Sequence, residues 1–272
     1  MKTLIINIGI TNILAIVLMF SCTRTEGVIE KECDCISIPV PDDIYIYPFR
    51  PGDNAWSKLN GYERIEACQL PDSLLKVIST QGLVETCVNH PLIEELIFSD
   101  LPFGLQDAME RMMQMFNCLE ELSIRTDAGS KLLSRYLLMK PCCVKDRYMV
   151  LDQGDFVNSY SEYEMIFAQE IFIEQMSRQE LITLTAKALS TYHEKVEYVD
   201  YYSWIYGMNT SAFLIARCMF RLQYEPFLQE MEKSNDLKQF VNNCSLPGSE
   251  PDLNNFFEKI NDFAKDLLKQ EL

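Results

Sequence analysis

Histidine is scarce in this chain, which has only two among its 272 residues. A Ser–His–Asp or Cys–His nucleophile needs an imidazole within hydrogen-bonding reach and a third group to orient it. His90 and His193 belong to separate helical patterns, and the sequence also lacks a Gly-x-Ser-x-Gly elbow, a Gly-rich phosphate loop and a His-Glu-x-x-His motif. We therefore expect a protein that binds or scaffolds, and not an enzyme.

Positive charge is scarce as well. The chain has 24 Lys and Arg against 40 Asp and Glu, which gives a formal net charge of −16 at pH 7. A field of this sign repels nucleic acids and anionic lipid head groups. We expect no nucleic-acid partner, and any attachment to a membrane has to come from something other than a basic patch.

The N-terminus contains the clearest functional signal. Lys2 is followed by the apolar run Leu4–Phe20, then by the small residue Ser21 and by Cys22, after which the sequence turns polar. This layout is typical of a lipoprotein signal, in which residues 1–21 are removed and Cys22 becomes the acylated first residue. Because two or more acyl chains anchor a protein stably, we predict that the lipid on Cys22 attaches the protein to a membrane.

Two alternatives for this segment remain open. The apolar run has 17 residues, close to the lower limit of a membrane-spanning helix, which needs roughly 20. An uncleaved anchor is therefore one alternative, although Asn7 and Asn12 interrupt the run. Simple secretion is the other. Ser21 fits a plain cleavage site, but Met19 and Phe20 are bulkier than the residues usual before one, and they also make the lipoprotein motif a loose match.

The chain behind the signal divides into an arm and a helical domain. Residues 22–52 contain four prolines and predict a lipid-anchored tether, in which Asp42–Tyr47 forms either a short strand or an extended arm packed on the body. Residues 53–272 predict a helical domain. Its longest loop-like break, residues 141–158, is the candidate joint between two subdomains.

The pattern of the helical domain predicts an all-α fold. One amphipathic stripe consists of Leu105, Ala108, Met109, Met112 and Phe116. Ser211–Leu222 is apolar nearly all round and should be central and buried. Ser161–Glu164 and Ser177–Glu180 both read as capping boxes that start helices. We expect serial antiparallel helix pairs in an irregular, α-solenoid-like bundle without a strict repeat.

Three segments of this domain resemble a known group of proteins. They are residues 79–91, residues 127–136 and residues 212–217, and they lie within a region of similarity that covers roughly residues 70–240. This region is similar to uncharacterised all-helical lipoproteins and secreted proteins of Bacteroidetes. The resemblance implies a helical fold and the Gram-negative cell envelope, where we expect an outer-membrane lipoprotein on the periplasmic or surface face. That family has no assigned activity, so no functional residue follows from it.

Sulfur-containing residues offer two candidate metal sites. Cys33, Cys35, Cys142 and Cys143 lie in loop-like sequence, and their thiols could bind zinc, but the usual two-residue spacing is absent. A pair of disulfides or reduced thiols is the alternative that we favour. Met109, Met112 and Cys118 could bind Cu(I), yet both methionines belong to the apolar stripe, where methionine is an ordinary core residue. We expect no metal and no cofactor.

An aromatic cluster is the candidate recognition surface, and its members are Tyr198, Tyr201, Tyr202, Trp204 and Tyr206. Aromatic rings with polar tips suit a glycan or protein partner. The same residues would suit a wedge between two helices, and carboxylates beside them would suit a glycan hydrolase. The sequence leaves these arrangements open.

Three polar residues receive structural interpretations. Arg217 lies in the most apolar segment, so it is either a buried charge that needs a carboxylate or an arginine that snorkels to the edge. His90, next to Pro91, should cap carbonyls at a helix end. Lys195 follows His193 and Glu194 in what reads as a solvated helix end.

Overall fold

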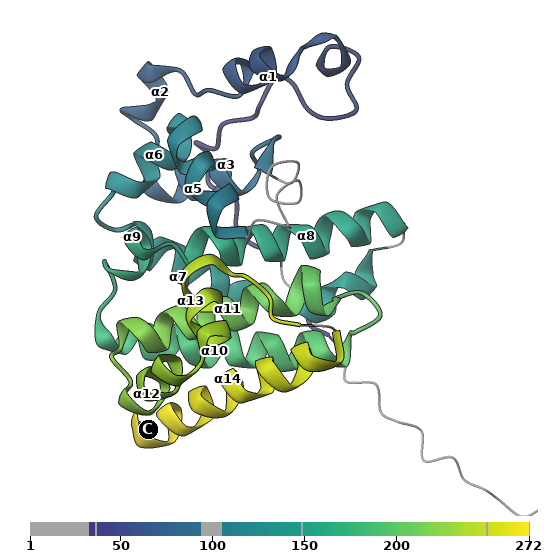
Figure 1. Cartoon of the computed structure of the whole chain (residues 1–272). Helices are drawn as coiled ribbons and strands as arrows, with labels where there is room; N and C mark the ends of the chain where they lie inside the picture. The colour runs from purple at the N-terminus through teal and green to yellow at the C-terminus, as the bar shows by residue number, and fades with distance from the viewer. Residues whose placement is uncertain (1–32, 36, 94–104, 148, 249, 272) are drawn as a thin grey trace, which may run out of the picture. The chain divides into compact units, whose positions relative to one another are not determined.

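The computed structural model describes residues 33–271 apart from residues 36, 94–104, 148 and 249 (Figure 1). The signal segment and Cys22 lie outside the described residues, so the predictions made for them stay predictions. All regular elements of the described part are helical, which confirms the all-α class, and there is no strand among them. No helix in this part is both long and apolar enough to cross a membrane.

The described elements can be taken in three groups along the chain. The first group contains η1 (Trp56–Lys58), α1 (Gly61–Ala67), α2 (Asp72–Leu75), α3 (Thr80–Val88), α5 (Leu105–Met115) and α6 (Asn117–Ile124). The second contains α7 (Ala128–Leu138), η3 (Pro141–Asp146), α8 (Val150–Phe167) and α9 (Glu170–Ile173). The third contains α10 (Arg178–Glu197), the π-helix η4 (Trp204–Met208), α11 (Asn209–Arg221), α12 (Glu225–Lys233), α13 (Asn235–Asn243) and α14 (Glu250–Glu271).

Helix α11 lies at the centre of the C-terminal half. It contacts α8, α10, α13 and α14 as well as η4, and Figure 1 shows it running between α8 and α14. Most of its residues are buried, including Asn209 and Ser211, which confirms the prediction of a central helix. A solenoid repeat contacts only its neighbours, so the many partners of α11 describe a bundle here, and the solenoid-like order of helix pairs stays a prediction.

The side-chain caps show which of the predicted helix starts are correct. Ser177 and Glu180 form the predicted capping box of α10, and the Ser79 hydroxyl accepts a hydrogen bond from the Gly82 amide at the start of α3. The second predicted capping box is wrong, because Ser161 and Glu164 lie inside α8.

The segment 141–158 is mostly helical. Residues 141–146 form η3, and α8 already begins at Val150, so the loop prediction was wrong for the second half of the segment. Polar residues and Gly154 hide the helical pattern in this first half of α8, which has several exposed positions. Residues 34–272 form one compact unit, and the segment belongs to it.

The arm packs on this unit as an extended segment, not as a strand. The Asp43 carboxylate accepts a hydrogen bond from the Ser79 amide at 2.6 Å, and the Tyr45 amide donates to the Thr86 hydroxyl at 3.0 Å. Tyr47 is only 3% exposed. The arm therefore contributes a side chain to the core, and it is bonded along α3, to Ser79 at the N-terminal end and to Thr86 near the C-terminal end.

His90 holds Tyr47 in place from inside the core. Its ring lies 5.1 Å from that of Tyr47 and 3.9 Å from that of Phe116, measured between centroids. Its Nδ1 accepts a hydrogen bond from the Leu92 amide, so the prediction that it caps carbonyls was wrong. Burial lowers the pKa of His90 to about 3, which keeps the ring neutral at ordinary pH.

Two glycines in helices provide a matched test of this packing. A Cβ on Gly129 of α7 would lie 2.7 Å from the backbone oxygen of Phe172, whereas a Cβ on Gly154 of α8 would meet nothing within 4 Å. We expect Gly129→Ala to lower the free energy of unfolding by about 1–3 kcal/mol through overpacking. Gly154→Ala should raise it by up to about 1 kcal/mol through helix propensity. Chemical denaturation measures both, and a stabilising Gly129→Ala would contradict the close approach of α7 and α9.

Candidate functional site

A buried carboxylate lies where α7, α8, α10 and α11 meet. Glu164 is completely buried, and its two oxygens accept hydrogen bonds from four side chains. Oε1 accepts from the Tyr136 hydroxyl at 2.6 Å and from the Ser211 hydroxyl at 2.7 Å. Oε2 accepts from the Lys195 ammonium at 2.8 Å and from the Thr210 hydroxyl at 2.6 Å. We call these five residues the Glu164 network.

Lys195 is equally satisfied. Its ammonium donates to Glu164, to the Gly207 carbonyl at 2.8 Å and to the Ser211 hydroxyl at 2.9 Å, which uses all three of its donors. Lys195 is completely buried, so the prediction of a solvated helix end was wrong. Because every strong donor and acceptor of the ion pair is occupied, the Glu164 network has the properties of a structural centre and leaves no group free for a substrate.

Burial dominates the electrostatics of this network. It lowers the pKa of the Lys195 ammonium, while Glu164 beside it favours the charged form. Burial and then the charge of Glu164 raise the pKa of the Tyr136 phenol well above its usual value. Tyr136 therefore remains a hydrogen-bond donor to the carboxylate throughout the physiological pH range.

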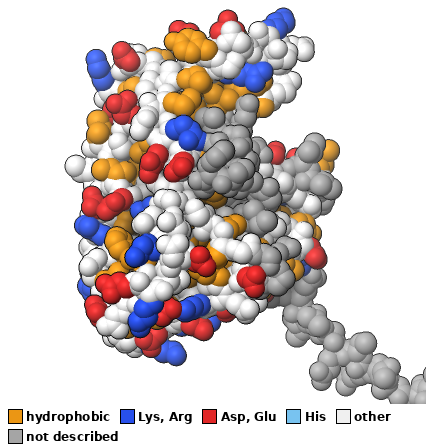
Figure 2. Space-filling view, viewed as in Figure 1, with side chains coloured by type: hydrophobic (Ala, Val, Ile, Leu, Met, Phe, Trp, Pro, Cys, Tyr) orange, Lys and Arg blue, Asp and Glu red, His pale blue; other side chains and the backbone are white. Residues whose placement is uncertain are grey.

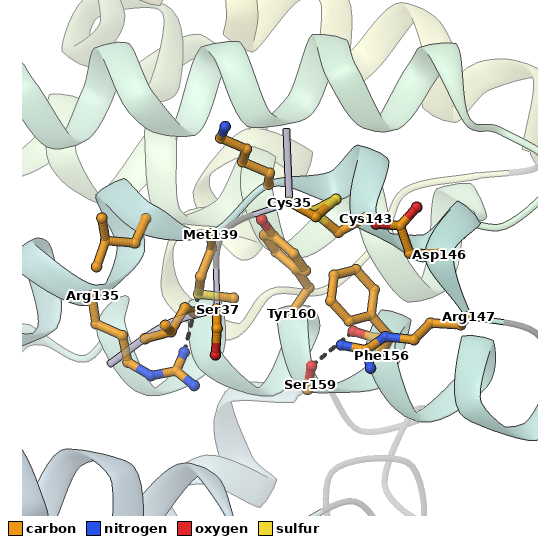
Figure 3. A pocket seen from close by; sticks show the side chains of 13 residues that line it. Cys35, Ser37, Arg135, Met139, Cys143, Asp146, Arg147, Phe156, Ser159 and Tyr160 are labelled. Atoms are coloured by element: carbon orange, nitrogen blue, oxygen red, sulfur yellow. Dashed lines mark hydrogen bonds between the residues drawn. A yellow bond between two sulfur atoms is a disulfide. The ribbon is translucent and has the colours of Figure 1, made fainter. Parts of the chain in front are cut away.

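A pocket of about 500 Å³ opens next to this network (Figure 3). It is formed by the arm, by the end of α7, by η3 and by α8. Its lining consists of Cys35, Ser37, Ile38, Arg135, Leu138, Met139, Lys140, Cys143, Asp146, Arg147, Phe156, Ser159 and Tyr160. We call it the disulfide pocket, because the Cys35–Cys143 bond forms part of its wall.

The four loop cysteines are all oxidised. Cys35 bonds Cys143 across 108 residues of sequence, and Cys33 and Cys142 are disulfide-bonded as well. All four sulfurs lie within 4.8 Å of one another, and as disulfides they offer no thiolate to zinc. Of the two favoured alternatives, disulfides or reduced thiols, the structure has the disulfides. The remaining described cysteines are free and buried, as expected for small core residues.

Two guanidinium groups approach the pocket from opposite sides (Figure 3). Arg135 forms an ion pair with Glu85 at 2.7 Å and lies 4.7 Å above the Tyr163 ring. Arg147 is exposed and lies 5.2 Å above the Phe156 ring. Thus Arg135, at one end of the pocket, is paired with a carboxylate, whereas Arg147, at the other end, is stacked on an aromatic ring.

Tyr160 connects the pocket to the Glu164 network. The Lys195 ammonium lies 5.0 Å from the centre of its ring, and the ring itself lines the pocket. Its buried hydroxyl has no hydrogen-bond partner within the described part of the chain and in Figure 3 is directed toward Cys35. Unsatisfied buried polar groups are rare in native proteins. The Tyr160 hydroxyl, which lies between the Glu164 network and the disulfide pocket, is one of these rare groups.

The predicted aromatic surface is largely packed. Tyr202 is completely buried, and its hydroxyl donates to the Pro141 carbonyl at 3.1 Å. Trp204 stacks on Phe257, and Tyr198 lies below the Lys145 ammonium. Tyr201 is half-buried, and the side chain of Tyr206 lies outside the described residues. These contacts agree with a wedge between helices, and a recognition role for the cluster stays a prediction.

The other predicted site residues also have structural surroundings. Arg217 is half-buried, lies 5.0 Å above the Phe213 ring and donates to the Asn242 carbonyl at 3.0 Å. Because Arg217 is only half-buried and bonds a backbone oxygen, these contacts agree with the alternative of an arginine that reaches the edge of the core. Met109 and Met112 are completely buried core residues.

The sequence alone did not predict the disulfide pocket. Its residues come from segments around positions 35, 140 and 155, and none of them forms a motif by spacing. Only the cysteines carried a signal, because an oxidised pair joins distant segments. Arg135 and Arg147 look like ordinary surface cations in the sequence, and Tyr160 looks like an ordinary core residue.

The Glu164 network yields a stability prediction. Lys195→Met leaves the Glu164 carboxylate buried without its counter-charge, and we expect a loss of roughly 3–5 kcal/mol in the free energy of unfolding. Arg221→Met is the matched control, because it removes an exposed ion pair to Glu174 and should cost less than about 1 kcal/mol. Denaturant titration of both variants tests the idea, and equal losses would refute a central role for Lys195.

Comparison with models of known protein families, with curated proteins and with solved structures finds no match for this chain. The likeness to helical lipoproteins of Bacteroidetes thus stays a prediction. The function has to be argued from the pocket, the disulfides and the N-terminal signal of this chain itself.

Proposed function

We propose that the protein is a lipid-anchored binding protein of the bacterial cell envelope and that the disulfide pocket is its ligand site. One observation carries the proposal: the pocket of about 500 Å³ next to the Cys35–Cys143 bond. Binding sites for small molecules typically measure about 300–1,000 Å³ and have mostly apolar walls with a few polar groups. The lining of the disulfide pocket has this mixed character.

The disulfide supports both parts of the proposal. Disulfides form and persist in oxidising compartments such as the periplasm and the cell surface, in agreement with export by the predicted signal. The same bond holds the arm residues Cys35, Ser37 and Ile38 in the pocket wall. A site that is closed by a covalent bond keeps its shape without a ligand, and preorganisation lowers the cost of binding.

The position of the pocket in the chain fits an anchored receptor. Cys35 follows Cys22 by 13 residues, and a fully extended segment of that length spans at most about 45 Å. A lipid on Cys22 would therefore hold the pocket wall within that distance of the membrane surface. Ligands released at or near the membrane would be within reach of the site.

The two alternative functions receive no support from the described residues. A glycan hydrolase would need two facing carboxylates in an open cleft beside the aromatic cluster. The Lys195 ammonium lies 5.5 Å from the centre of the Tyr202 ring, and the carboxylate that it bonds, Glu164, is buried and fully hydrogen-bonded. A copper site on Met109 and Met112 would need thioethers that a metal ion can reach, and both are in the core.

Blocking the pocket tests the binding role. Ser37 is exposed and lines the pocket, so Ser37→Trp should fill it, while Ser57→Trp places the same side chain at an exposed site elsewhere. We expect compounds from a small-molecule library to raise the melting temperature of the wild type and of Ser57→Trp, but not of Ser37→Trp. A compound present at about 100 times its Kd should raise the free energy of unfolding by about 2.7 kcal/mol. Compounds that stabilise all three proteins equally would argue against the pocket.

Metabolic labelling with an acyl analogue tests the anchor. The wild type should be labelled, and Cys22→Ala should lose the label because the acylated sulfur is gone. Cys244→Ala, which changes a buried free cysteine, is the control and should keep the label. An unlabelled wild type, or label that persists on Cys22→Ala, would disprove the lipoprotein assignment.

A further inference from the structure

Arg147 differs from the other cations around the disulfide pocket. Arg135 is paired with Glu85, and the Lys140 ammonium donates to the Asp34 carbonyl at 2.6 Å. The Arg147 side chain has only the Phe156 ring as a partner within the described part of the chain. Its charge is therefore not compensated by a carboxylate there, in a chain whose formal net charge is −16.

The stacking on Phe156 leaves the N–H groups at the edge of the Arg147 guanidinium available for hydrogen bonds. A guanidinium that lies on an aromatic face still presents its N–H donors in the plane of the group, in the fork that matches a carboxylate, sulfonate or phosphate. Figure 3 shows this group reaching the pocket beside Ser159. The Ser159 hydroxyl already donates to the Phe156 carbonyl, so the Arg147 guanidinium supplies the donors for an anion here.

The charge distribution favours Arg147 as the anion-binding residue over Arg135. The Nε of Arg135 is bonded to Glu85, and its Nη1 contacts the Met139 sulfur at 3.2 Å. An anion near Arg135 would meet the Glu85 carboxylate, which is ion-paired with that guanidinium. Asp146 lines the pocket next to Arg147, but none of the described ion pairs joins it to the Arg147 guanidinium. Figure 2 shows acidic and basic side chains interspersed on the visible face, so a local pocket and not a broad basic patch provides the attraction.

The remaining walls are mixed: Asp146 and Ser37 contribute polar groups, and the rest of the surface is largely apolar. Ile38, Leu138, Met139 and Phe156 line the pocket together with the Cys35–Cys143 bond. Leu138 is 44% exposed, so apolar surface is open to a ligand. A bare inorganic anion would leave these walls uncovered, and burial of apolar surface favours a ligand that covers them.

We propose that the disulfide pocket binds an organic anion, with its carboxylate, sulfonate or phosphate group on Arg147 and its apolar body against Ile38, Leu138 and Met139. This proposal rests on the proposed binding function and names the ligand class. Anions of this kind occur free in solution and as head groups of lipids, and the recognition chemistry is the same for both.

A pair of fluorescent probes separates charge from shape. Anilinonaphthalene sulfonate carries a sulfonate on the same rings as the neutral N-phenylnaphthylamine. The mature chain from residue 22, with Cys22→Ser so that no lipid competes, is titrated with each probe. The neutral probe lacks the charge-assisted interaction that the sulfonate makes with Arg147. We therefore expect the sulfonate probe to bind roughly tenfold to a hundredfold more tightly than the neutral probe.

Two variants with the same loss of charge complete the test. Arg147→Gln should reduce the affinity for the sulfonate probe to that for the neutral probe, and it should leave the neutral probe unchanged. Arg221→Gln, at the exposed pair with Glu174, should change neither affinity. Arg147 is exposed, so its replacement leaves the core intact.

The outcomes distinguish the two proposals. Equal affinities for the two probes, or an unchanged sulfonate affinity in Arg147→Gln, overturn the anion proposal, and the pocket function survives if Ser37→Trp abolishes binding of both. If neither probe nor any library compound binds, both proposals fail. Displacement of the sulfonate probe by dihexanoyl phosphatidylglycerol alone would assign the anion to a lipid, and displacement by phenylpropionate alone to a free carboxylate. Failure of both competitors overturns the anion proposal.

Discussion

The ion pair between Glu164 and Lys195 is the interaction on which the rest of the structure depends. Both side chains are completely buried, and the desolvation of two charges is tolerated only when every donor and acceptor has a partner. Those partners come from α7, α11 and the π-helix η4. The helices therefore have to reach their final positions together, because an incomplete arrangement leaves a charge unsatisfied in the interior.

The Glu164 network also fixes the helices α7 and α8, which form one side of the disulfide pocket. Helix α8 contributes Glu164 to the network and Tyr160, one turn earlier, to the pocket lining. Helix α7 contributes Tyr136 to the network and the adjacent Arg135 to the pocket. A site whose residues sit on elements held from behind keeps its geometry. In the proposed binding role the network would act indirectly, by holding the two helices that carry Arg135, Leu138, Phe156, Ser159 and Tyr160 of the pocket lining.

The opposite wall depends on covalent chemistry. The Cys35–Cys143 bond holds the arm against η3. Further along, the Asp43 carboxylate and the buried Tyr47 fasten the arm to α3 and to the core. A complete pocket then requires an oxidising environment, which export by the predicted N-terminal signal would provide.

Hydrophobic periodicity was sufficient to predict the all-α class and the buried helix α11, because these depend on local pattern. It left the arm open between a short strand and a packed extended segment. The two Ser-x-x-Glu segments show what the local sequence pattern cannot predict. Ser177–Glu180 caps α10 at the surface, whereas the same spacing at Ser161–Glu164 lies inside α8 and supplies the buried carboxylate. Glu164 meets Lys195 across 31 residues, and Arg147 faces the pocket only because the arm closes it. Tertiary structure decided these roles, since burial and charge partners are set by segments distant in sequence.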